Sequence, residues 1–394
     1  MLLEKYPAPV VGPFTPRERS VKKPPSPNNR PFISSAFTPH VILFITRKYP
    51  PAIGGMEEFS RQLTAAYPGP ARLCALRRGQ RWLPLFLLTA AVQCAAARGR
   101  VSAIHLGDGL LALAAPVFEA LADAPAVVTV HGQDVTRPFP GYGGLVRMAL
   151  RRLGPRRVVA VSSYTAGEVL RRCGFRPRVI LNGVDVDRFA AIQRAPDPAA
   201  ARAALGLPPR GPLIVSVGRL VERKGIAWFA RQVLPLLPRD VVFAVAGDGP
   251  ELPRLRAIAA AEPRLVLLGA LPDPAVDRLY ACADLFVAPN VPVPGRPEGF
   301  GIAPAEAAAA GLPVLVAALE GLVDMASVSG ATLVQPADPR AWAAAVSNAL
   351  AAPPRSRPRV RSWADVAADY ARLFESVAAE ARRASPRPIR PAPK

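Results

Sequence analysis

The carboxylates Glu298 and Glu306 lie eight residues apart, at the start of an alanine-rich stretch that predicts a helix. Pro304 falls where a first helical turn would begin, a position that tolerates proline because its N–H has no partner within the helix. Gly299 and Gly301 allow a ligand to approach the backbone closely. The segment therefore predicts a helix N-terminus that suits a phosphate. We expect Glu306 in the first turn and Glu298 on the preceding loop, where carboxylates could bind hydroxyls. The alternative is simple compensation of the helix dipole.

Other glycine and polar residues follow expected strands in the first half of the chain. Gly54 and Gly55 predict a tight turn into a helix N-terminus, suited to a diphosphate or to the sugar beside it, with a plain loop as the alternative. His131 is followed by a glycine and by polar residues that include Asp134. A lone histidine at a strand end is usually structural, so a ligand-binding role remains one of two interpretations. Asn182 begins an Asn-Gly dipeptide, which often forms only a turn.

The second half of the chain carries two cations beside glycine turns. Arg219 and Lys224 follow an expected strand, and two such charges could hold a pyrophosphate leaving group. Gly247 follows the next strand in a Gly-Asp-Gly-Pro turn. The dinucleotide fingerprint needs a third glycine at the right spacing, so a nicotinamide-dependent oxidoreductase is disfavoured.

Composition narrows the class of protein. The chain has 394 residues, of which 51% are hydrophobic, which is enough for two ordinary domains. Its four cysteines are scattered and form no cluster with the three histidines. This pattern predicts reduced thiols and no structural metal site, as in the cytoplasm.

The formal charge of +21 suggests an anionic partner. Aromatic residues are sparse and are not interleaved with the basic ones, which argues against nucleic acid. An anionic membrane surface is the better candidate, with a peripheral location at its inner face. Residues 82–97 are uncharged and flanked by arginines, but the stretch is too short to span a bilayer. It predicts either a core helix or an interfacial one.

The alternation of short apolar runs with helical patterns predicts an α/β fold with parallel sheets. We expect a disordered leader at 1–39, a first Rossmann-like domain at 40–190, a linker at 191–212, a second Rossmann-like domain at 213–361, a helix at 362–380 capped by Ser362, and a disordered basic tail at 381–394. The expected strands are 41–46, 71–76, 102–106, 126–130, 158–162, 179–181, 213–217, 241–246, 265–268, 285–288, 314–317 and 332–334.

The order of these motifs resembles that of the retaining glycosyltransferases called family 4 or group 1. The resemblance covers about Val41 to Glu380 and is most specific at the two carboxylates. It implies the GT-B fold, with two facing Rossmann-like domains and the active site in the cleft between them. The motifs that carry it are Gly54-Gly55-x-Glu57, the His131 loop, Asn182-Gly-Val-Asp185, Gly218-Arg219 with Lys224-Gly225, Gly247-Asp-Gly249 and Glu298-x7-Glu306.

The resemblance also implies an activity: transfer of a hexose from a nucleotide diphosphate sugar to an acceptor hydroxyl, with retention and without a metal or other cofactor. Arg219 and Lys224 would bind the diphosphate, and Glu306 would bind the ribose hydroxyls. Glu298 would bind the donor sugar. The remaining implied contacts are the amides of Phe300 and Gly301 on the sugar or phosphate, His131 near the anomeric centre, and Gly55 near the diphosphate.

No side chain stands out as a covalent nucleophile, so we expect front-face attack by the acceptor. A lipid-linked or cell-surface glycan acceptor is suggested by charge and apolarity alone. The chain departs from the family where a Gly-Gly-x-x-Glu pattern is replaced by Leu319-Glu320-Gly321-Leu-Val-Asp324. The competing functions are a nucleotide-sugar epimerase and a catalytically silent binding protein on the same fold. Loss of Glu298, Glu306, Arg219 or Lys224 would indicate the silent protein, and all four are present.

Overall fold

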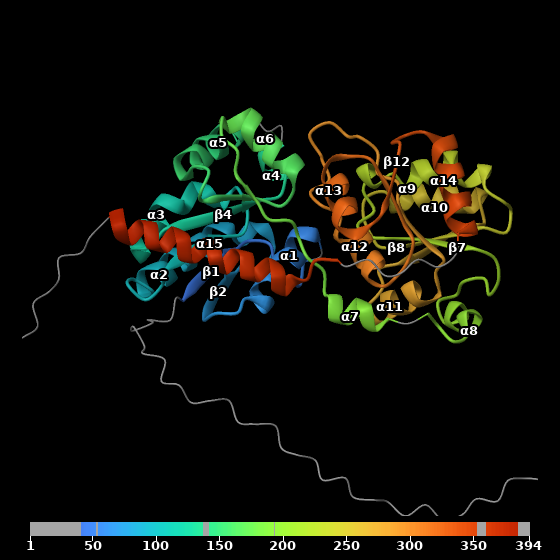
Figure 1. The fold of residues 1–394 in the computed structure, drawn as a ribbon, viewed down its shortest axis with the longest axis horizontal. Coiled ribbons are helices and arrows are strands. Elements are labelled where there is room, and N and C mark those ends of the chain that lie inside the picture. Colours follow the sequence, from blue (N-terminus) through green and yellow to red (C-terminus); the bar gives the residue numbers. More distant parts are fainter. Residues whose placement is uncertain (1–40, 53, 137–141, 193, 353–359, 385–394) are drawn as a thin grey trace, which may run out of the picture. The chain divides into compact units, whose positions relative to one another are not determined.

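Two six-stranded parallel sheets form the framework of the protein (Figure 1). The computed structural model describes residues 41–52, 54–136, 142–192, 194–352 and 360–384. The predicted leader at 1–39 and most of the predicted tail at 381–394 lie outside these residues.

The first sheet has the strand order β2-β1-β3-β4-β5-β6. Its strands are β1 (Ile42–Thr46), β2 (Ala71–Ala75), β3 (Ala103–Leu106), β4 (Ala126–Val130), β5 (Val158–Ala160) and β6 (Arg178–Val179). The helical segments in this part of the chain are α1 (Gly55–Ala66), η1 (Gln80–Trp82), α2 (Leu83–Ala96), η2 (Leu111–Ala114), α3 (Ala115–Ala122), α4 (Gln133–Thr136), α5 (Tyr142–Leu153), α6 (Ser163–Cys173) and α7 (Val186–Ala191).

The second sheet has the order β12-β11-β10-β7-β8-β9. Its strands are β7 (Leu213–Val217), β8 (Val242–Ala246), β9 (Leu265–Gly269), β10 (Leu285–Ala288), β11 (Val314–Ala317) and β12 (Thr332–Val334). The helical segments here are α8 (Pro198–Ala203), η3 (Glu222–Lys224), α9 (Ile226–Gln232), η4 (Leu234–Leu236), α10 (Leu252–Ala261), α11 (Asp273–Cys282), α12 (Ile302–Ala309), α13 (Glu320–Ser329) and α14 (Pro339–Ala351).

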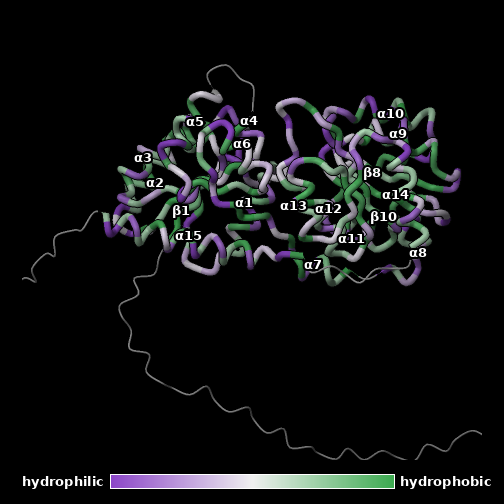
Figure 2. The backbone as a smooth tube through the Cα atoms, turned by 45° about the horizontal axis from the view of Figure 1, so that its top comes forward, coloured by the Kyte–Doolittle hydropathy of each residue, from purple (hydrophilic) through white to green (hydrophobic). Residues whose placement is uncertain are grey.

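All twelve predicted strands are present, because parallel strands covered on both faces are continuous apolar runs. Strands such as β1, β4 and β8 are buried along their whole length, and hydrophobic residues gather on β8 and its neighbours (Figure 2). β5 ends two residues earlier than predicted. Ser162 instead caps α6, where its hydroxyl accepts a hydrogen bond from the Thr165 amide at 3.1 Å.

The last described helix, α15 (Trp363–Ala384), packs on the first sheet rather than the second. Trp363, Tyr370 and Phe374 join Phe44 and Phe59 in one buried cluster. Figure 1 shows α15 lying along the first sheet beside α1. As predicted, Ser362 caps the helix, with its hydroxyl accepting from the Asp365 amide at 3.1 Å. The helix continues beyond the predicted end at residue 380.

The predicted linker at 191–212 contains the short helix α8. Asp197 caps this helix by accepting from the Ala200 amide at 3.0 Å, and Pro198 occupies its first turn. Arg202 is buried and donates to the Cys282 carbonyl and to Asp284. The segment is therefore tied to α11, which its weak sequence pattern did not predict. The domain boundaries themselves stay a prediction.

Residues 82–97 form α2, which is partly core and partly surface. Phe86, Ala90 and Cys94 are buried, whereas Leu85, Leu88 and Val92 are more than half exposed. Across the described parts of the chain, no helix is both long enough and apolar enough to cross a bilayer. The four cysteines are all unpaired and buried.

Candidate active site

Glu298 is the centre of a buried charge cluster on the loop between β10 and α12. Lys224 Nζ lies 2.6 Å from its carboxylate, and Arg223 Nε lies 3.7 Å away. Asn290 Nδ2 donates to the same oxygen at 3.2 Å. Burial alone would raise the pKa of Glu298, but Lys224, Arg223 and these hydrogen bonds outweigh it and lower the pKa to about 2. Glu298 is thus a fixed negative charge within a cationic surrounding.

Close backbone packing brings Lys224 to Glu298. Gly225 ends η3 with φ of 67°, and a Cβ at this position would lie 1.9 Å from the Pro289 carbonyl oxygen. The Val291 amide donates to the Arg223 carbonyl at 3.0 Å. Only glycine permits this contact at such a φ. The turn that carries both cations is therefore held against the loop that follows β10.

Glu320, in the loop that departs from the family pattern, also contacts Glu298. Its carboxylate accepts a hydrogen bond from the Glu298 amide, and its φ of 50° is one that favours glycine. The next residue, Gly321, packs so tightly that a Cβ would lie 2.1 Å from the Gly299 carbonyl oxygen. Burial raises the pKa of Glu320. A second carboxylate is thus positioned beside the first.

The glycine loop leads into α12, as predicted, but the helix begins at Ile302 and not at Pro304. Glu306 therefore lies in the second turn, and the expectation that it lies in the first turn is wrong. Proline fits equally well here because the third N–H of a helix also lacks an intrahelical partner. Gly301 precedes the helix with φ of 90°, and Phe300 is buried in the core.

Glu306 has an electrostatic environment opposite to that of Glu298. Burial, with the nearby negative charges of Glu58, Asp273 and Asp277, raises the pKa of Glu306 to about 8, although Arg188 opposes the shift. Arg188 itself pairs with Asp277 at 2.7 Å and with Asp273 at 2.9 Å. The side chain of Glu306 therefore holds a proton at neutral pH and can donate as well as accept hydrogen bonds.

His131 lies at the carboxyl end of β4, with its ring held on two sides. Nε2 donates to the Gly107 carbonyl at 3.0 Å, which leaves Nδ1 as the second polar atom of the ring. Phe59 packs edge-on at 4.8 Å between ring centroids. Asp134 accepts from the His131 amide and from the Gly109 amide, both at 2.9 Å. Burial raises the pKa of Asp134. The Asp134 carboxylate thus fixes the conformation of the loop by binding backbone amides.

Several short contacts join the loops of the two sheets. A Cβ at Gly299 would lie 2.9 Å from the His131 carbonyl oxygen, and one at Gly55 would lie 4.0 Å from Ile302. The Ser163 amide donates to Asp324 at 2.7 Å. The beginnings of α1 and α12 are therefore close together, as a diphosphate site between them requires. Gly54 precedes α1, whose Glu57 pairs with Lys48 at 3.1 Å.

The remaining predicted residues lie around this site in different ways. Arg219 is exposed at the end of β7. A Cβ at Gly247 would lie 1.9 Å from the Gly218 carbonyl oxygen, so this glycine shapes the Arg219 turn. Asn182 is buried where the chain leaves the first half, next to Gly183, which packs against Ser362. The structure does not bring Asn182 into the Glu298 cluster.

Sequence reasoning missed Arg223, Asn290, Glu320 and Asp108. Among the described residues, the buried side-chain polar atoms without a hydrogen-bond partner are Arg223 Nε, Asn290 Oδ1, Asp108 Oδ2, Tyr280 Oη and, outside the Glu298 cluster, Asn182 Oδ1. Tyr280 interacts electrostatically with Glu306, and Asp108 adjoins the Gly107 carbonyl that His131 contacts. Such orphaned groups need an explanation, and a bound polar ligand is one. Arg223 could have been found from the sequence, because it lies between the two predicted cations Arg219 and Lys224 on the same turn.

The two parallel sheets, with glycine loops, cations and carboxylates after their strands, define a GT-B protein. A solved relative in fold is HepE of Anabaena in complex with UDP, which matches 87% of this chain and 98% of its own with a TM-score of 0.63 and 18% identity. At that identity the likeness shows the fold alone.

Two family descriptions match the sequence: Glycosyltransferase Family 4 at residues 37–188 and Glycosyl transferases group 1 at residues 211–352. The chain is 30% identical to the 2-deoxystreptamine N-acetyl-D-glucosaminyltransferase of Streptomyces fradiae, covering 71% of this chain and 70% of that one. It is 34% identical to the GDP-mannose-dependent alpha-(1-6)-phosphatidylinositol monomannoside mannosyltransferase of Mycolicibacterium smegmatis, over 62% of this chain and 66% of that one.

The chain belongs to the group 1, or family 4, glycosyltransferases. It spans between 47% and 66% of the length of four curated relatives that it matches, the Mycolicibacterium smegmatis protein among them.

Proposed function

We propose that the protein is a retaining glycosyltransferase that moves a hexosyl group from a nucleotide diphosphate sugar to an acceptor hydroxyl without a metal ion. The observation that carries the proposal is the pair of Lys224 with the buried Glu298, beside which Arg223 Nε and Asn290 Oδ1 are buried without a hydrogen bond. This is an incomplete polar network, and polar atoms of a ligand would complete it.

Charge supports a diphosphate as part of that ligand. Arg223 and Lys224 lie against the carboxylate of Glu298, and Arg219 follows β7 as an exposed cation on the same turn, so three cations of this turn are available to a diphosphate. Fixed cations and amide dipoles stabilise the negative charge that develops on a leaving diphosphate. The N-terminus of α12 supplies such dipoles close to α1.

The proposed step breaks the bond between the anomeric carbon and the diphosphate oxygen. The acceptor oxygen forms the new bond on the same face, and its proton passes to the departing phosphate. His131 Nδ1 would accept a hydrogen bond from a sugar hydroxyl, because Nε2 is committed to the Gly107 carbonyl. Glu298 would bind the hydroxyls of the donor sugar, and Glu306 would bind the ribose of the nucleotide.

The acceptor that we propose is lipid-linked. The Mycolicibacterium smegmatis relative is named for a phosphatidylinositol monomannoside acceptor, and α2 exposes three large apolar side chains. Such an acceptor places the enzyme at the surface of an anionic membrane.

The first test is thermal unfolding with GDP-mannose, UDP-glucose, UDP-galactose and UDP-N-acetylglucosamine, alongside assays of slow donor hydrolysis. One donor should raise the melting temperature, and Lys224→Ala and Glu306→Ala should abolish the shift. Arg210→Ala, which removes an exposed arginine elsewhere, is the control. Absence of binding to every nucleotide sugar would contradict the proposal and favour a silent binding protein.

The second test uses the identified donor and its released or transferred sugar. Nuclear magnetic resonance of the first product should show the anomeric configuration of the donor, and EDTA should leave the rate unchanged. Inversion would contradict front-face attack. Release of free nucleotide together with an isomerised sugar would indicate an epimerase.

A further inference from the structure

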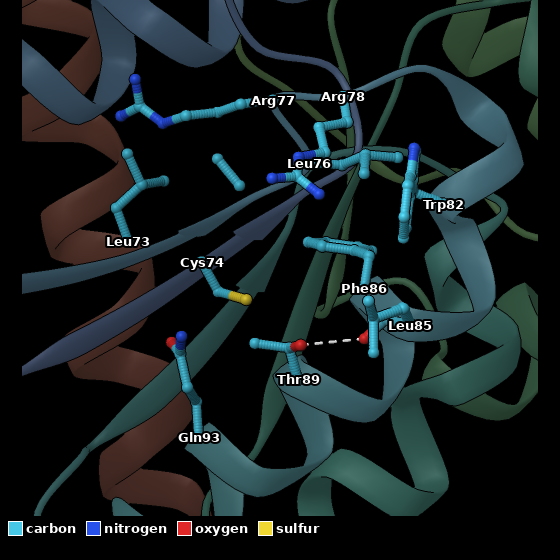
Figure 3. Close-up of a pocket in the computed structure, with 11 residues that line it drawn as sticks. Leu73, Cys74, Leu76, Arg77, Arg78, Trp82, Leu85, Phe86, Thr89 and Gln93 are labelled. Carbon is cyan, nitrogen blue, oxygen red and sulfur yellow. Dashed lines mark hydrogen bonds between the residues drawn. The ribbon is translucent and has the colours of Figure 1, made fainter.

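A pocket of about 370 Å³ lies between the edge strand β2 and helix α2, away from the Glu298 cluster. Its volume is within the range of small-molecule sites. Leu73, Cys74, Leu76 and Phe86 give it an apolar wall. Figure 3 shows Arg77, Arg78 and Trp82 at one end of the pocket and Gln93 at the other. The pocket is thus apolar along its length and cationic at one end.

Aromatic rings hold the two arginines at that end. The Arg78 guanidinium lies 5.0 Å from the centre of the Trp82 ring, and that of Arg77 lies 5.1 Å from the centre of the Tyr49 ring. No aspartate or glutamate occurs between Glu58 and Asp108. The segment that forms the pocket therefore carries arginines and no acidic residue of its own.

The surface next to the pocket is also apolar. Leu88 and Val92 of α2 are 62% and 60% exposed, and Leu85, which lines the pocket, is 51% exposed. Val117 of the adjacent helix α3 is 54% exposed. Contiguous exposed apolar side chains mark an interaction surface. Leucines beside arginines and a tryptophan are the combination that lies in the headgroup region of a bilayer.

Hydrogen bonds connect the cationic end of the pocket with the His131 loop. Gln80, just before Trp82, accepts from Arg47 at 3.1 Å, and Arg47 donates to Asp108 at 3.0 Å. Asp108 follows Gly107, whose carbonyl accepts from His131. The cationic end of the pocket and the His131 loop therefore both follow strands of the first sheet at their carboxyl ends.

We propose that the β2–α2 pocket takes one acyl chain of an anionic phospholipid, with Arg77 and Arg78 on its phosphate and the exposed face of α2 in the bilayer. A second copy of the chain is a poorer occupant, because a symmetric contact would bring the same arginines together. The proposal rests on the proposed function for the lipid-linked acceptor, but lipid binding is measurable without any transfer.

The first experiment is sedimentation of the full chain with vesicles of phosphatidylcholine alone or of equal parts phosphatidylcholine and phosphatidylglycerol. Binding is expected only with phosphatidylglycerol. Arg77→Ala/Arg78→Ala should weaken it about 10- to 30-fold, whereas the matched pair Arg210→Ala/Arg239→Ala should bind as the parent does. Leu88→Glu should abolish binding, and Leu236→Glu, at a residue 54% exposed in the second half, should not.

A second experiment asks whether a chain enters the pocket. Vesicles with brominated acyl chains should quench tryptophan fluorescence, and Trp82→Phe should remove that quenching, because Trp342 and Trp363 are buried and the partly buried Trp228 packs edge-on against Trp342 in the second half of the chain. Thr89→Phe, which places a larger side chain at the pocket wall, should weaken the quenching without changing the melting temperature.

Three results would overturn the proposal: equal binding to both kinds of vesicle, quenching that survives Trp82→Phe and Thr89→Phe, or a dimer in sedimentation velocity that Leu88→Glu converts to a monomer. Nucleotide-sugar binding in the thermal assay does not depend on α2. Failure of the lipid proposal and failure of the transferase proposal are therefore distinguishable.

Discussion

Glu298 and Glu306 carry the same side chain in opposite electrostatic environments. Lys224 and Arg223 keep Glu298 ionised, whereas neighbouring acidic groups and burial keep Glu306 protonated. Titratable groups whose environments push their pKa values apart often have different tasks in one site. Here the charged residue adjoins the cations expected to hold a diphosphate, and the neutral one is suited to hydroxyls.

Removal of Lys224 should be costly because it leaves a buried charge without its partner. We expect Lys224→Ala to lower the free energy of unfolding by about 3 kcal/mol. Lys224→Ala/Glu298→Gln should recover part of that loss, since the remaining amide is neutral. Urea denaturation of the two variants measures this difference, with Arg210→Ala as the unaffected control. An additive double variant would contradict the pairing.

Glu306 should make stability depend on pH in a defined window. Its folded pKa of about 8 lies above the ordinary value of 4.5, so the folded state retains a proton that the unfolded state has lost. Stability should therefore fall as pH rises from 4.5 to 8 and then level off. Glu306→Gln has no proton to lose, so its free energy of unfolding should rise by about 1–2 kcal/mol relative to that of the parent between pH 4.5 and 8. This is less than the full pKa shift would give, because the side chain is partly exposed. A difference in unfolding free energy between Glu306→Gln and the parent that is the same at every pH would contradict this prediction.

At the scale of elements, the strands were predictable and the details of the site loops were not. Buried parallel strands can be recognised as apolar runs. The Ser162 cap of α6 was not recognised, because residues 158–162 were predicted as one strand, although serine is a favoured N-cap residue. Glu320 could not be predicted as a partner of Glu298, because its contact depends on a glycine-like φ and on the packing of Gly321 against Gly299. Periodicity likewise gave α15 an apolar face without indicating which sheet it covers.

Gly225 offers a test of how the loops position the cations. Gly225→Ala adds a Cβ that would lie 1.9 Å from the Pro289 carbonyl oxygen, at a φ of 67°. Gly206 has nearly the same φ, 68°, with open space around it, so Gly206→Ala measures the cost of conformation alone. We expect Gly206→Ala to cost about 1 kcal/mol and Gly225→Ala clearly more, with loss of donor-induced thermal stabilisation only in the latter. Equal costs would show that the contact with Pro289 is unimportant.

At the scale of the whole molecule, α15 joins the described end of the chain to the first sheet. Its Tyr370 hydroxyl lies 2.8 Å from Thr129 Oγ1, which contacts His105 at 2.9 Å. Burial lowers the pKa of His105 to about 3, so this ring stays neutral. The hydrophobic core beside the first sheet thus includes residues of α15, which follow the second sheet in the sequence.

Phe374 should be essential to that completion. Phe374→Ala removes a side chain 1% exposed from the cluster with Phe44 and Tyr370 and should cost about 3–5 kcal/mol. The exposed neighbour in Glu375→Ala should change stability by less than about 0.5 kcal/mol. Calorimetry gives both values. A small effect of Phe374→Ala would mean that α15 packs loosely on the sheet.

The return of α15 also sets an order of events on the ribosome. Domains usually fold as they emerge, the N-terminal one first. Here Phe44 and Phe59 are synthesised early, yet their partners Trp363 and Tyr370 leave the exit tunnel only after every strand of the second sheet. During synthesis, the apolar face of the first half that α15 will cover therefore stays exposed until the second half has been synthesised. A chaperone would have to protect this nascent first half rather than the finished enzyme.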